Sequence, residues 1–372
     1  MESTNKSREM DETCMKRALE LAARGSGWTS PNPLVGAVLV KEGRVIGEGW
    51  HQRYGDLHAE REALQNCQED PAGADLYVTL EPCCHTGKQP PCTEAIVKAG
   101  IKRVVVGCLD SNPLVSGKGM QILKEQGIEV ETGVLEEECR QLNRVFFHFM
   151  QKQRPYVTLK FAMTLDGKIA TSTGDAKWIT GETARKQVHE TRHQNRAIMV
   201  GIGTVLADDP RLDCRLPGKR SPIRIVCDTH LRTPLDSQLM KTASEIPLIV
   251  AAGKSAAAKA GVYQEAGCQV WLLEERNGKL DLQGLLKRLG KARIDSLLLE
   301  GGGTLNGAML EAGLVDRIQA YIAPKLIGGN GKSPVQGNGV SRMAEALALE
   351  NVEFSRVGDD FLLEGDVPGR EV

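Results

Sequence analysis

The strongest constraint on the fold is the alternation of short apolar runs with helical segments along the whole chain. Apolar runs of about four to eight residues between amphipathic helices are typical of sheets covered by helices. Gly36–Val40 and Val45–Gly49 are two such runs, and the polar link between them predicts a hairpin. Glycine is abundant, at 40 of 372 residues, which suits the many tight connections of such folds. We therefore predict an α/β protein with mixed or parallel sheets.

The apolar runs are candidate strands and the amphipathic segments are candidate helices. In the first part of the chain we predict strands at Gly36–Val40, Val45–Gly49, Asp75–Leu80, Arg103–Gly107 and Ile128–Thr132, and helices at Glu12–Ala23, from His58 onward, at Thr93–Lys98 and at Glu136–Phe149. In the second part we predict strands at Tyr156–Ala162, Ala197–Gly201, Ile223–Cys227, Pro247–Ala251, Gln269–Leu273, Ser296–Leu299 and Arg317–Ala323, helices at Thr183–Gln194, Leu282–Leu289 and Thr304–Glu311, and a hairpin at Val352–Glu364.

The chain is too long for one ordinary domain, and its charge is divided unevenly. Residues 1–150 contain 17 Lys+Arg and 22 Asp+Glu, a net charge of −5, whereas residues 151–372 contain 30 and 26, a net of +4. The short polar stretch Gln151–Pro155 ends in a proline that cannot continue a helix. We predict two domains, at residues 1–150 and 151–372.

The composition excludes several classes of partner. The near-neutral net charge and the 4% aromatic content give no support for nucleic-acid binding. Met1–Glu12 is polar, and apolar runs such as Leu34–Val40 are far shorter than the roughly 18 residues of a membrane span. Ten cysteines in a chain of this kind indicate reduced thiols. We expect a cytoplasmic protein with a small-molecule substrate, no membrane or nucleic-acid partner, and assembly as a homo-oligomer.

One cluster of residues in the first part predicts a catalytic zinc site. His58 is followed by Cys83 and Cys92, which makes three zinc-competent ligands and leaves the fourth position for water. Water on zinc ionises near neutral pH and becomes a nucleophile. Glu60, two residues after His58, is placed to take a proton from that water and deliver it to a leaving nitrogen. Positions i and i+2 point to different sides within a helix, so such a pair works best at the start of a helix, where both side chains can reach over its end.

Each residue of this cluster by itself has an ordinary structural explanation. A histidine two positions before a glutamate is common, and Cys83 alone would be a buried thiol. Their order, with Cys92 at a predicted helix start that favours a thiolate, is typical of zinc deaminases. The segment between the two cysteines is longer than in the general deaminase pattern. Cys84 is adjacent to Cys83, and we interpret it as a bystander because adjacent thiols rarely ligate one tetrahedral ion.

Two glycine clusters in the second part indicate a dinucleotide site. Gly201-Ile202-Gly203 begins like a Rossmann fingerprint, but Leu206 stands where its last glycine belongs. Glycines 301–303 follow a predicted strand and precede a helix, where backbone N–H groups can approach a phosphate. A tight strand-to-helix turn would explain the same glycines.

The motifs of the first part closely resemble the deaminase half of the bifunctional riboflavin-biosynthesis deaminase–reductases. The matching segments are Pro31–Gly36, His58–Glu60, Glu81–Cys92, Asp110–Pro113 and Gly117–Gly119, with slight departures at Cys84 and Ser111. The resemblance implies a cytidine-deaminase-like, three-layer α/β/α domain in which His58, Cys83 and Cys92 bind Zn²⁺ and Glu60 is the general acid/base. It also implies that the pyrimidine and its ribose phosphate contact Asn32, His51, His85 and Lys88. From the residues alone, His51 and Lys88 would be surface residues.

The second part resembles the reductase half of the same enzymes, which has a dihydrofolate-reductase-like α/β fold. The matching segments are Arg154–Tyr156, Lys160–Lys168, Trp178–Thr180, Thr204–Pro210, Glu300–Gly303 and Tyr321–Lys325. The resemblance implies that NADPH contacts Ala162, Trp178, Thr204, Asp208, Thr229, Gly302, Gly303, Thr304, Leu305, Asn306, Gly307 and Ala308. It implies that the sugar phosphate contacts Lys160, Ala176, Arg192, Leu212, Arg215 and Glu300. Ala176 stands where the family commonly has Ser, so a contact there must use the backbone.

Plainer structural roles remain open for several of these residues. Trp178 would pack in a core, Arg192 would be a solvated helix residue, and Asp208 and Glu300, both expected in loops after strands, would cap neighbouring backbone.

The resemblance implies two consecutive reactions. The first is hydrolytic deamination of 2,5-diamino-6-ribosylamino-4(3H)-pyrimidinone 5′-phosphate. The second is NADPH-dependent reduction of the ribosyl group to a ribityl chain. Two other functions are compatible with zinc ligands alone: a nucleic-acid base deaminase with an accessory domain, which the −5 charge of residues 1–150 disfavours, and a zinc-stabilised scaffold, which would need a fourth protein ligand such as His85.

Overall fold

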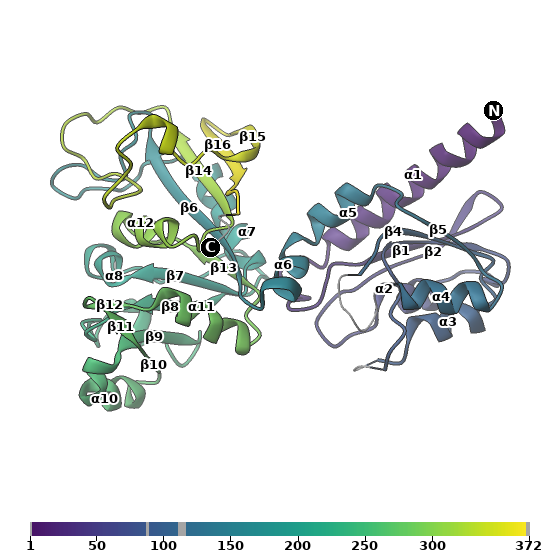
Figure 1. Ribbon diagram of the computed structural model, residues 1–372, viewed down its shortest axis with the longest axis horizontal. Coiled ribbons are helices and arrows are strands. Elements are labelled where there is room, and N and C mark those ends of the chain that lie inside the picture. The colour runs from purple at the N-terminus through teal and green to yellow at the C-terminus, as the bar shows by residue number, and fades with distance from the viewer. Residues whose placement is uncertain (1, 87–88, 111–116, 370–372) are drawn as a thin grey trace. The chain divides into compact units, whose positions relative to one another are not determined.

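The computed structural model describes residues 2–86, 89–110 and 117–369, except for the side chains of residues 2–7. The chain divides into two compact units, Met1–Gln153 and Arg154–Val372 (Figure 1). Each unit has its own sheet and its own buried apolar clusters. Among the described residues, no helix is long and apolar enough to cross a membrane.

The first unit is built on one mixed sheet. Its strands follow the order β2-β1-β3-β4-β5; β1 pairs antiparallel with β2 and β3, and β3, β4 and β5 run parallel. The strands are β1 Gly36–Lys41, β2 Arg44–Trp50, β3 Asp75–Leu80, β4 Arg103–Cys108 and β5 Glu129–Thr132. The helices are α1 Glu2–Ala23, α2 Ala59–Gln65, α3 Cys92–Lys98, α4 Lys118–Glu125, α5 Glu136–Leu142 and α6 Arg144–Lys152.

This sheet lies between two layers of helices. Figure 1 shows α1 and α5 on one face and α2, α3 and α4 on the other. One buried cluster joins Met15, Leu21 and Tyr77, and the other joins Leu39, Leu76 and other residues of the opposite face. Neighbouring residues of each strand point to opposite faces, so the strands are apolar on both sides. The expected three-layer α/β/α arrangement is confirmed.

The second unit contains a nine-stranded sheet in the order β10-β9-β8-β7-β13-β6-β14-β16-β15. The strands from β10 to β14 are parallel, and β16 and β15 are antiparallel additions at one edge. The strands are β6 Tyr156–Thr164, β7 Ala197–Gly201, β8 Ile223–Cys227, β9 Leu248–Gly253, β10 Gln269–Leu273, β13 Ser296–Leu299, β14 Arg317–Ala323, β15 Glu350–Val357 and β16 Asp360–Asp366, with β11 Glu275–Arg276 and β12 Lys279–Leu280 as a separate small hairpin.

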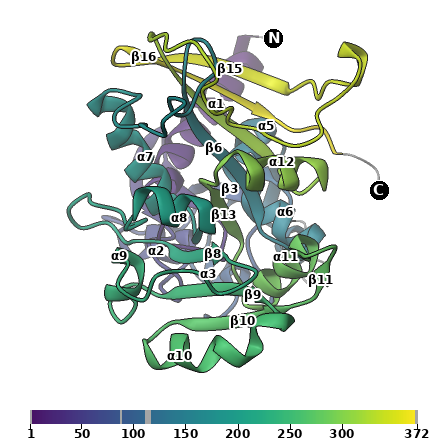
Figure 2. The same ribbon diagram turned by 90° about the vertical axis from the view of Figure 1, so that its left-hand side faces the viewer.

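Helices cover both faces of this sheet. Because the central strands are parallel, their carboxyl ends lie at one edge of the sheet. The α-helices are α7 Glu182–Gln194, α8 Ile202–Asp208, α9 Gln238–Lys241, α10 Ala260–Glu265, α11 Leu282–Lys291 and α12 Gly303–Glu311, with 3₁₀ segments η1 Lys254–Lys259 and η2 Met343–Glu345. Leu285 and Met309 pack on one face of the sheet, and Val205, Leu239 and Tyr263 pack on the other. Figure 1 shows α8 beside β7, and Figure 2 shows α8 and α12 in the same region as β13. The expected α/β fold of this part is confirmed.

The structure contains elements that the sequence analysis did not predict, among them α4, α9, α10 and the hairpin β11–β12, and three further differences have a clear physical origin. The first helix begins at Glu2, ten positions before the predicted Glu12, because its start carries no apolar period to mark it. The predicted helix Glu136–Phe149 is divided at Asn143, whose side chain binds the backbone N–H and C=O of Leu34, each at 2.8 Å. Asp208 was expected in a loop, but it is the last residue of α8.

Candidate functional site

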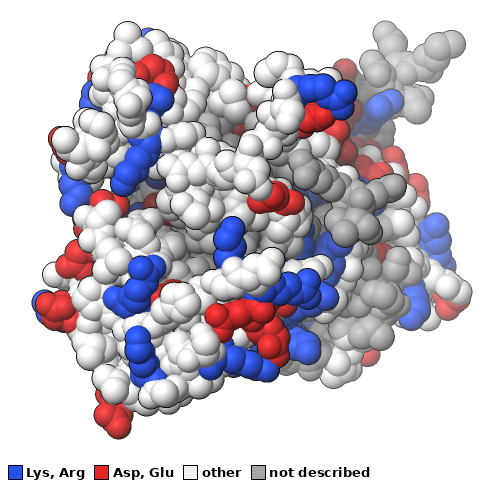
Figure 3. All heavy atoms as spheres, turned by 60° about the vertical axis from the view of Figure 1, so that its left-hand side comes forward, with Lys and Arg blue, Asp and Glu red and all other residues white. Residues whose placement is uncertain are grey.

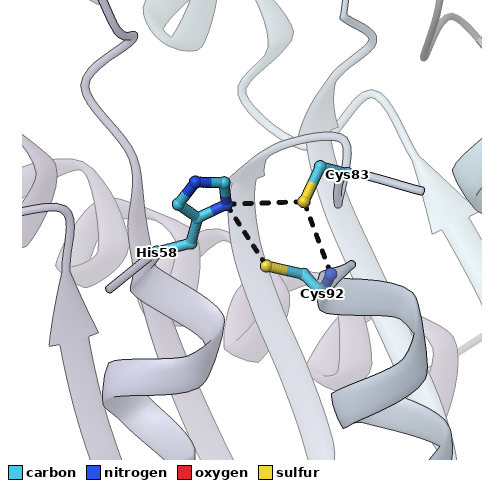
Figure 4. Close-up of side chains that lie close together, drawn as sticks. All are labelled: His58, Cys83 and Cys92. Carbon is cyan, nitrogen blue, oxygen red and sulfur yellow. Dashed lines mark hydrogen bonds between the residues drawn. The ribbon is translucent and has the colours of Figure 1, made fainter. Parts of the chain in front are cut away.

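Three predicted metal ligands meet in the first unit. His58 Nδ1 lies 3.4 Å from Cys83 Sγ and 3.4 Å from Cys92 Sγ, and the three ligand atoms lie within 4.8 Å of one another. Figure 4 shows the imidazole pointing at both sulfurs from the start of a neighbouring helix. Among residues 2–86, 89–110 and 117–369, these three side chains are the one group of three or more His, Cys, Asp or Glu residues that could hold a metal ion.

Each ligand lies at the end of a secondary-structure element. His58 is the N-cap of α2, and Cys92 is the first residue of α3. Cys83 lies in the loop after β3, where its carbonyl oxygen accepts the backbone N–H of Cys92 at 3.0 Å. The backbone N–H of Cys92 also points at Cys83 Sγ, 3.4 Å away. The unpaired N–H groups of a helix start favour negative charge, which suits a thiolate.

Two residues that the sequence analysis missed hold these loops. Glu81 is buried, and its carboxylate accepts the backbone N–H groups of Asp110, Gly117 and Gly119. Arg61, on α2, donates to the carbonyl oxygens of Pro90 and Pro91, directly before Cys92. Glu81 belongs to the matching family segment, but only the fold shows what its carboxylate binds.

The donor set fits zinc. One imidazole and two thiols are ligands that Zn²⁺ prefers, and three protein ligands leave one tetrahedral position open. Hydrogen bonds from Cys92 and His58 hold the pKa of the Cys83 thiol well below its usual value, despite burial. Neither Cys84 nor His85 belongs to the described group of three, and His85 is exposed. The arrangement is therefore of the catalytic kind with an open position, and a closed four-ligand scaffold gains no support from the described residues.

Glu60 lies beside the three ligands, in the first turn of α2. It is 3% exposed, and Cys92 is a hydrogen-bonding neighbour of its carboxyl group. Burial, followed by the negative charge of Cys83, raises the pKa of Glu60 to about 7, although His58 opposes the shift. A carboxyl group with a pKa near neutrality can both accept and return a proton.

Two of the four predicted pyrimidine contacts lie next to the metal ligands. His51 is buried, and its ring centroid is 5.6 Å from that of His58. His51 Nδ1 lies 2.9 Å from Leu57 O and Nε2 lies 3.2 Å from Asn32 Nδ2, so Nδ1 donates and Nε2 accepts. Burial lowers the pKa of His51, which favours this neutral form. His85 is exposed on the loop after Cys83, and Lys88 lies outside the described residues.

The second unit contains a cavity of about 600 Å³ at the ends of its central parallel strands. Among the residues lining it are nine of the predicted ligand contacts: Ala176, Thr204, Asp208, Thr229, Gly302, Gly303, Thr304, Leu305 and Ala308. Ala176 was predicted to contact the sugar phosphate, and it lines this cavity together with the predicted NADPH contacts. The cavity lies where α/β proteins bind ligands, beyond the carboxyl ends of the strands.

Four predicted NADPH contacts do not line the cavity: Ala162, Trp178, Asn306 and Gly307. Asn306 is buried and donates to Pro334 O at 2.8 Å. A Cβ on Gly307 would lie 1.5 Å from Gln336 O, so glycine there permits close packing of α12 against that segment. Trp178 is 63% exposed beneath the guanidinium of Arg185, which excludes the alternative of core packing.

The glycines at the start of α12 are required by close packing and not by the backbone conformation of a tight turn, which was the alternative considered above. Gly302 has φ −71° and ψ 166°, which any residue can adopt. A Cβ on Gly303 would lie 2.6 Å from Ser333 O, and one on Gly302 would lie 3.3 Å from Thr204 Oγ1. Small residues thus keep the helix start close to its neighbours and open to the cavity.

A buried ion cluster joins three predicted substrate contacts. Arg192 donates from Nε and Nη2 to the two oxygens of Glu300, at 2.8 and 2.9 Å, and Lys160 Nζ lies 3.9 Å from Glu300 Oε2. Burial would raise the pKa of Glu300, but Arg192 and Lys160 outweigh it and lower the pKa to about 2. Arg192 is therefore not the solvated helix residue of the plainer alternative.

The remaining predicted substrate contacts lie on one loop near this cluster. Asp213, which the sequence analysis missed, accepts from Arg215 Nε at 3.1 Å, and its backbone oxygen accepts from Arg192 Nη1 at 3.1 Å. Leu212 is buried and has φ 53°. The loop therefore connects the exposed Arg215 to the buried pair of Arg192 and Glu300.

Family models match both units. The model described as "Cytidine and deoxycytidylate deaminase zinc-binding region" matches residues 8–108, and the model described as "RibD C-terminal domain" matches residues 155–363. Together they cover both predicted sites.

Relatives match nearly the whole chain. The riboflavin biosynthesis protein RibD of Actinobacillus pleuropneumoniae is 51% identical over 94% of this chain and 93% of its own. The solved structure of Acinetobacter baumannii RibD, form 1, covers 98% of this chain and 100% of its own, with a TM-score of 0.88 and 39% identity. That of a Thermotoga maritima diaminohydroxyphosphoribosylaminopyrimidine deaminase/5-amino-6-(5-phosphoribosylamino)uracil reductase covers 97% and 100%, with a TM-score of 0.84 and 39% identity.

Proposed function

The chain belongs to the RibD family of riboflavin biosynthesis proteins and is a bifunctional deaminase and reductase, and on this premise we propose how its residues divide the two reactions. The domain of residues 1–150 removes an amino group from the diaminopyrimidine nucleotide. The domain of residues 151–372 reduces the ribosyl group of the product to a ribityl chain with NADPH. The separation of the two clusters of site residues into two compact units supports this division.

In the first domain, His58, Cys83 and Cys92 hold Zn²⁺. When bound, the ion acts as a Lewis acid that makes water nucleophilic near neutral pH. The three ligands are fixed by two helix starts and one loop, so their side chains would hold the ion at one place.

Glu60 moves the proton that deamination requires. Its carboxylate takes a proton from the attacking water and, as a carboxylic acid, delivers it to the departing amino nitrogen, which leaves as ammonia. The bond from ring carbon to water oxygen forms, and the bond to nitrogen breaks. Burial of Glu60 and its raised pKa, about 7, support both halves of this transfer.

The pyrimidine lies against Asn32 and His51, and its ribose phosphate contacts His85. Lys88, the fourth contact, lies outside the described residues. The hydrogen bond between Asn32 and His51 fixes both side chains before substrate arrives. His51 stays neutral, because burial lowers its pKa and its Nδ1–H donates to Leu57 O. This pair therefore offers hydrogen bonds in a fixed orientation rather than a charge.

In the second domain, the residues that line the 600 Å³ cavity, including those at the start of α12, would hold NADPH. The cofactor supplies hydride to carbon 1′ of the sugar. Helix α12 is nine residues long, and the backbone N–H groups at its start can donate hydrogen bonds to an anion. These groups would bind the pyrophosphate of the cofactor. Thr204, Asp208 and Thr229 add contacts within the cavity. Ala162 and Trp178, which do not line it, would be reached only by the part of the cofactor that extends beyond the cavity. Asn306 and Gly307 act by seating α12 against residues 334–336.

The sugar phosphate of the substrate binds beside the ion cluster. Arg192 keeps unused N–H groups on Nη1 and Nη2 after binding Glu300 and Asp213. The buried Lys160 ammonium makes no close hydrogen bond with any residue that the structure describes. Glu300 orients both cations, and Arg215 adds an exposed guanidinium from the loop of Leu212. Ala176 contributes backbone only.

The observation that carries this proposal is the pairing of an open His–Cys–Cys site beside a buried glutamate with a separate glycine-bordered cavity beside a buried ion cluster. The test is to incubate the protein with the diaminopyrimidine nucleotide and follow ammonia with and without NADPH. We expect ammonia in both cases, and NADPH oxidation only after deamination. Absence of ammonia without NADPH would contradict two separate sites.

We also propose a cytoplasmic location and assembly as a homo-oligomer. None of the ten cysteines, all of which lie in the described residues, forms a disulfide, and reduced cysteines persist in a reducing compartment. On the face shown in Figure 3, Lys and Arg side chains are interspersed with other residues rather than gathered in one basic surface, which does not favour a polyanion partner. Light scattering of the purified protein would give the number of subunits, and a monomeric mass would contradict the proposed assembly.

A further inference from the structure

We propose that Arg232, assisted by Lys279, binds the 2′-phosphate of NADPH and so sets the preference for NADPH over NADH. The inference rests on the proposed NADPH site and adds the residues that read the cofactor's distinguishing group. Neither residue belongs to a motif in the sequence.

The cavity has two chemically different ends. The strand order β8-β7-β13-β6 places β6 and β8 three inter-strand spacings apart, roughly 14 Å at about 4.8 Å each. Glu300 follows β13, and its partner Lys160 lies on β6, so the substrate and the nicotinamide belong at the β6 end. The adenosine half must then extend past α12 toward β8 and β9.

Arg232 and Lys279 line the cavity at this second end. Arg232 lies on the loop after β8, and Lys279 lies on β12, whose hairpin is next to β9 in the fold. Both side chains are exposed, and neither makes a hydrogen bond or ion pair with any described residue. Leu280 and Leu282 line the same end and offer an apolar surface for the adenine ring. Two cationic side chains without a bonded partner among the described residues, next to an apolar surface, suit an adenosine that carries a phosphate on its ribose.

The loop that carries Arg232 is held by a buried carboxylate. Asp228 is fully buried, and its Oδ2 accepts the backbone N–H groups of Arg232 at 2.6 Å and Thr233 at 2.7 Å, and the hydroxyl of Thr233 at 2.8 Å. The backbone of Arg232 is thus fixed while its guanidinium stays free. Thr229, a predicted NADPH contact, lies on the same loop and lines the cavity.

The charges of the lining residues favour a phosphorylated ribose. The described charged residues along the cavity are Asp208, Arg232, Lys279 and Lys332, a net charge of +2 from three cations and one anion. A guanidinium presents paired N–H donors that match phosphate oxygens, and such charge-assisted bonds are stronger than neutral ones. Lys332 lies at the opposite end, where its backbone pairs with Ala170 after β6.

The test compares two small ligands that differ only in this phosphate. The affinities of the full chain for adenosine 2′,5′-bisphosphate and adenosine 5′-monophosphate are measured by calorimetry at fixed ionic strength. We expect the wild type to prefer the bisphosphate, Arg232→Ala to reduce that preference by about 10- to 100-fold, and Arg232→Lys to fall between them. Lys279→Ala should reduce the preference less than Arg232→Ala does.

Lys332→Ala is the matched control, because it removes one positive charge from the other end of the same cavity. It should leave the ratio of the two affinities unchanged. An unchanged ratio in Arg232→Ala, an equal change in Lys332→Ala, or no preference in the wild type would overturn the proposal. If NADPH oxidation with deaminated substrate persists in that case, the proposed function stands and only the assignment of Arg232 fails.

Discussion

Glu60 in the first unit and Glu300 in the second are both largely buried, but their surroundings shift their pKa values in opposite directions. No Lys or Arg side chain among the described residues is bonded to Glu60, and burial raises its pKa to about 7. Glu300 is clasped by Arg192 and faces Lys160, and these charges outweigh burial and lower its pKa to about 2. The first carboxyl group can carry a proton, whereas the second remains an anion. Burial alone therefore does not decide the role of a carboxyl group; its partners do.

The two sites also differ in how many residues define them. The zinc site depends on a few side chains whose atoms lie within 4.8 Å of one another. The cavity of the second unit is lined by more than twenty residues from many segments, and five of them are glycines. A change in one zinc ligand should therefore have a far larger effect than a change in one residue of the cavity wall.

Removal of a zinc ligand should give the largest effect. Cys92→Ser leaves two of three protein ligands, so zinc content should fall well below one per chain and ammonia release should be lost. Reduction of supplied deaminated substrate should persist. The matched control is Cys84→Ser, which should keep zinc and deamination. Metal analysis with both assays checks the pair, and zinc loss in Cys84→Ser but not in Cys83→Ser would show that the ligand assignment is wrong.

Breaking the ion cluster should give the next effect. Arg192→Ala removes a phosphate donor and leaves Glu300 without its bidentate partner, so KM for the deaminated substrate should rise by about 100-fold. Ammonia release by the first unit should not change. Steady-state kinetics of both reactions measure this, and an unchanged KM with a lowered melting temperature would assign Arg192 to stability alone.

The pH dependence of stability sharpens the contrast between the two glutamates. Because the folded-state pKa of Glu300 is lowered, its charge stabilises the second unit above its ordinary pKa of 4.5, and this contribution is lost as pH falls toward 2. The region around β13 should therefore open more often in Glu300→Gln than in the wild type at pH 6, which gives faster hydrogen exchange. This difference in exchange rate should become smaller as the pH falls toward 2. Hydrogen exchange of peptides covering β13, corrected for intrinsic rates, measures it. A difference that does not depend on pH would contradict the lowered pKa.

The smallest effect should come from Asp208. Its carboxylate is exposed, lines the cavity and makes no hydrogen bond with any described residue, so it does not cap a neighbouring loop. Asp208→Asn should weaken NADPH binding by about 10-fold and leave the melting temperature unchanged. Fluorescence titration with NADPH and thermal unfolding of the same sample separate the two roles. Unaltered binding would remove Asp208 from the cofactor contacts.

Much of the fold follows from local sequence. Strands such as Ala197–Gly201 and Ser296–Leu299 have the predicted bounds, because a buried parallel strand is an uninterrupted apolar run. The break at Asn143 could not be predicted, because it depends on a hydrogen bond to Leu34, more than a hundred positions away. The start of α1 and helix α8 were missed because neither shows a clear apolar period.

The sites were predictable to different degrees. The zinc ligands could be found because metal chemistry demands particular residue types near element ends. Glu81 and Arg61 hold the surrounding loops by hydrogen bonds to backbone atoms. Nothing in the sequence shows which backbone atoms they bind, so their role could not be predicted. Arg232 and Lys279 lie in unrelated segments that only the order of the strands brings to one end of the cavity.

The central claim is that Glu60 carries the proton of the first reaction and takes no part in the second. Glu60→Gln keeps the size of the side chain and the zinc ligands but cannot take up and return the proton. Both half-reactions are measured on one preparation of this variant, with zinc content as a control. We expect ammonia release to fall by at least about 10³-fold, while reduction of supplied deaminated substrate stays at the wild-type rate. Parallel loss of both activities in a folded, zinc-containing variant, or retained ammonia release, would contradict the account.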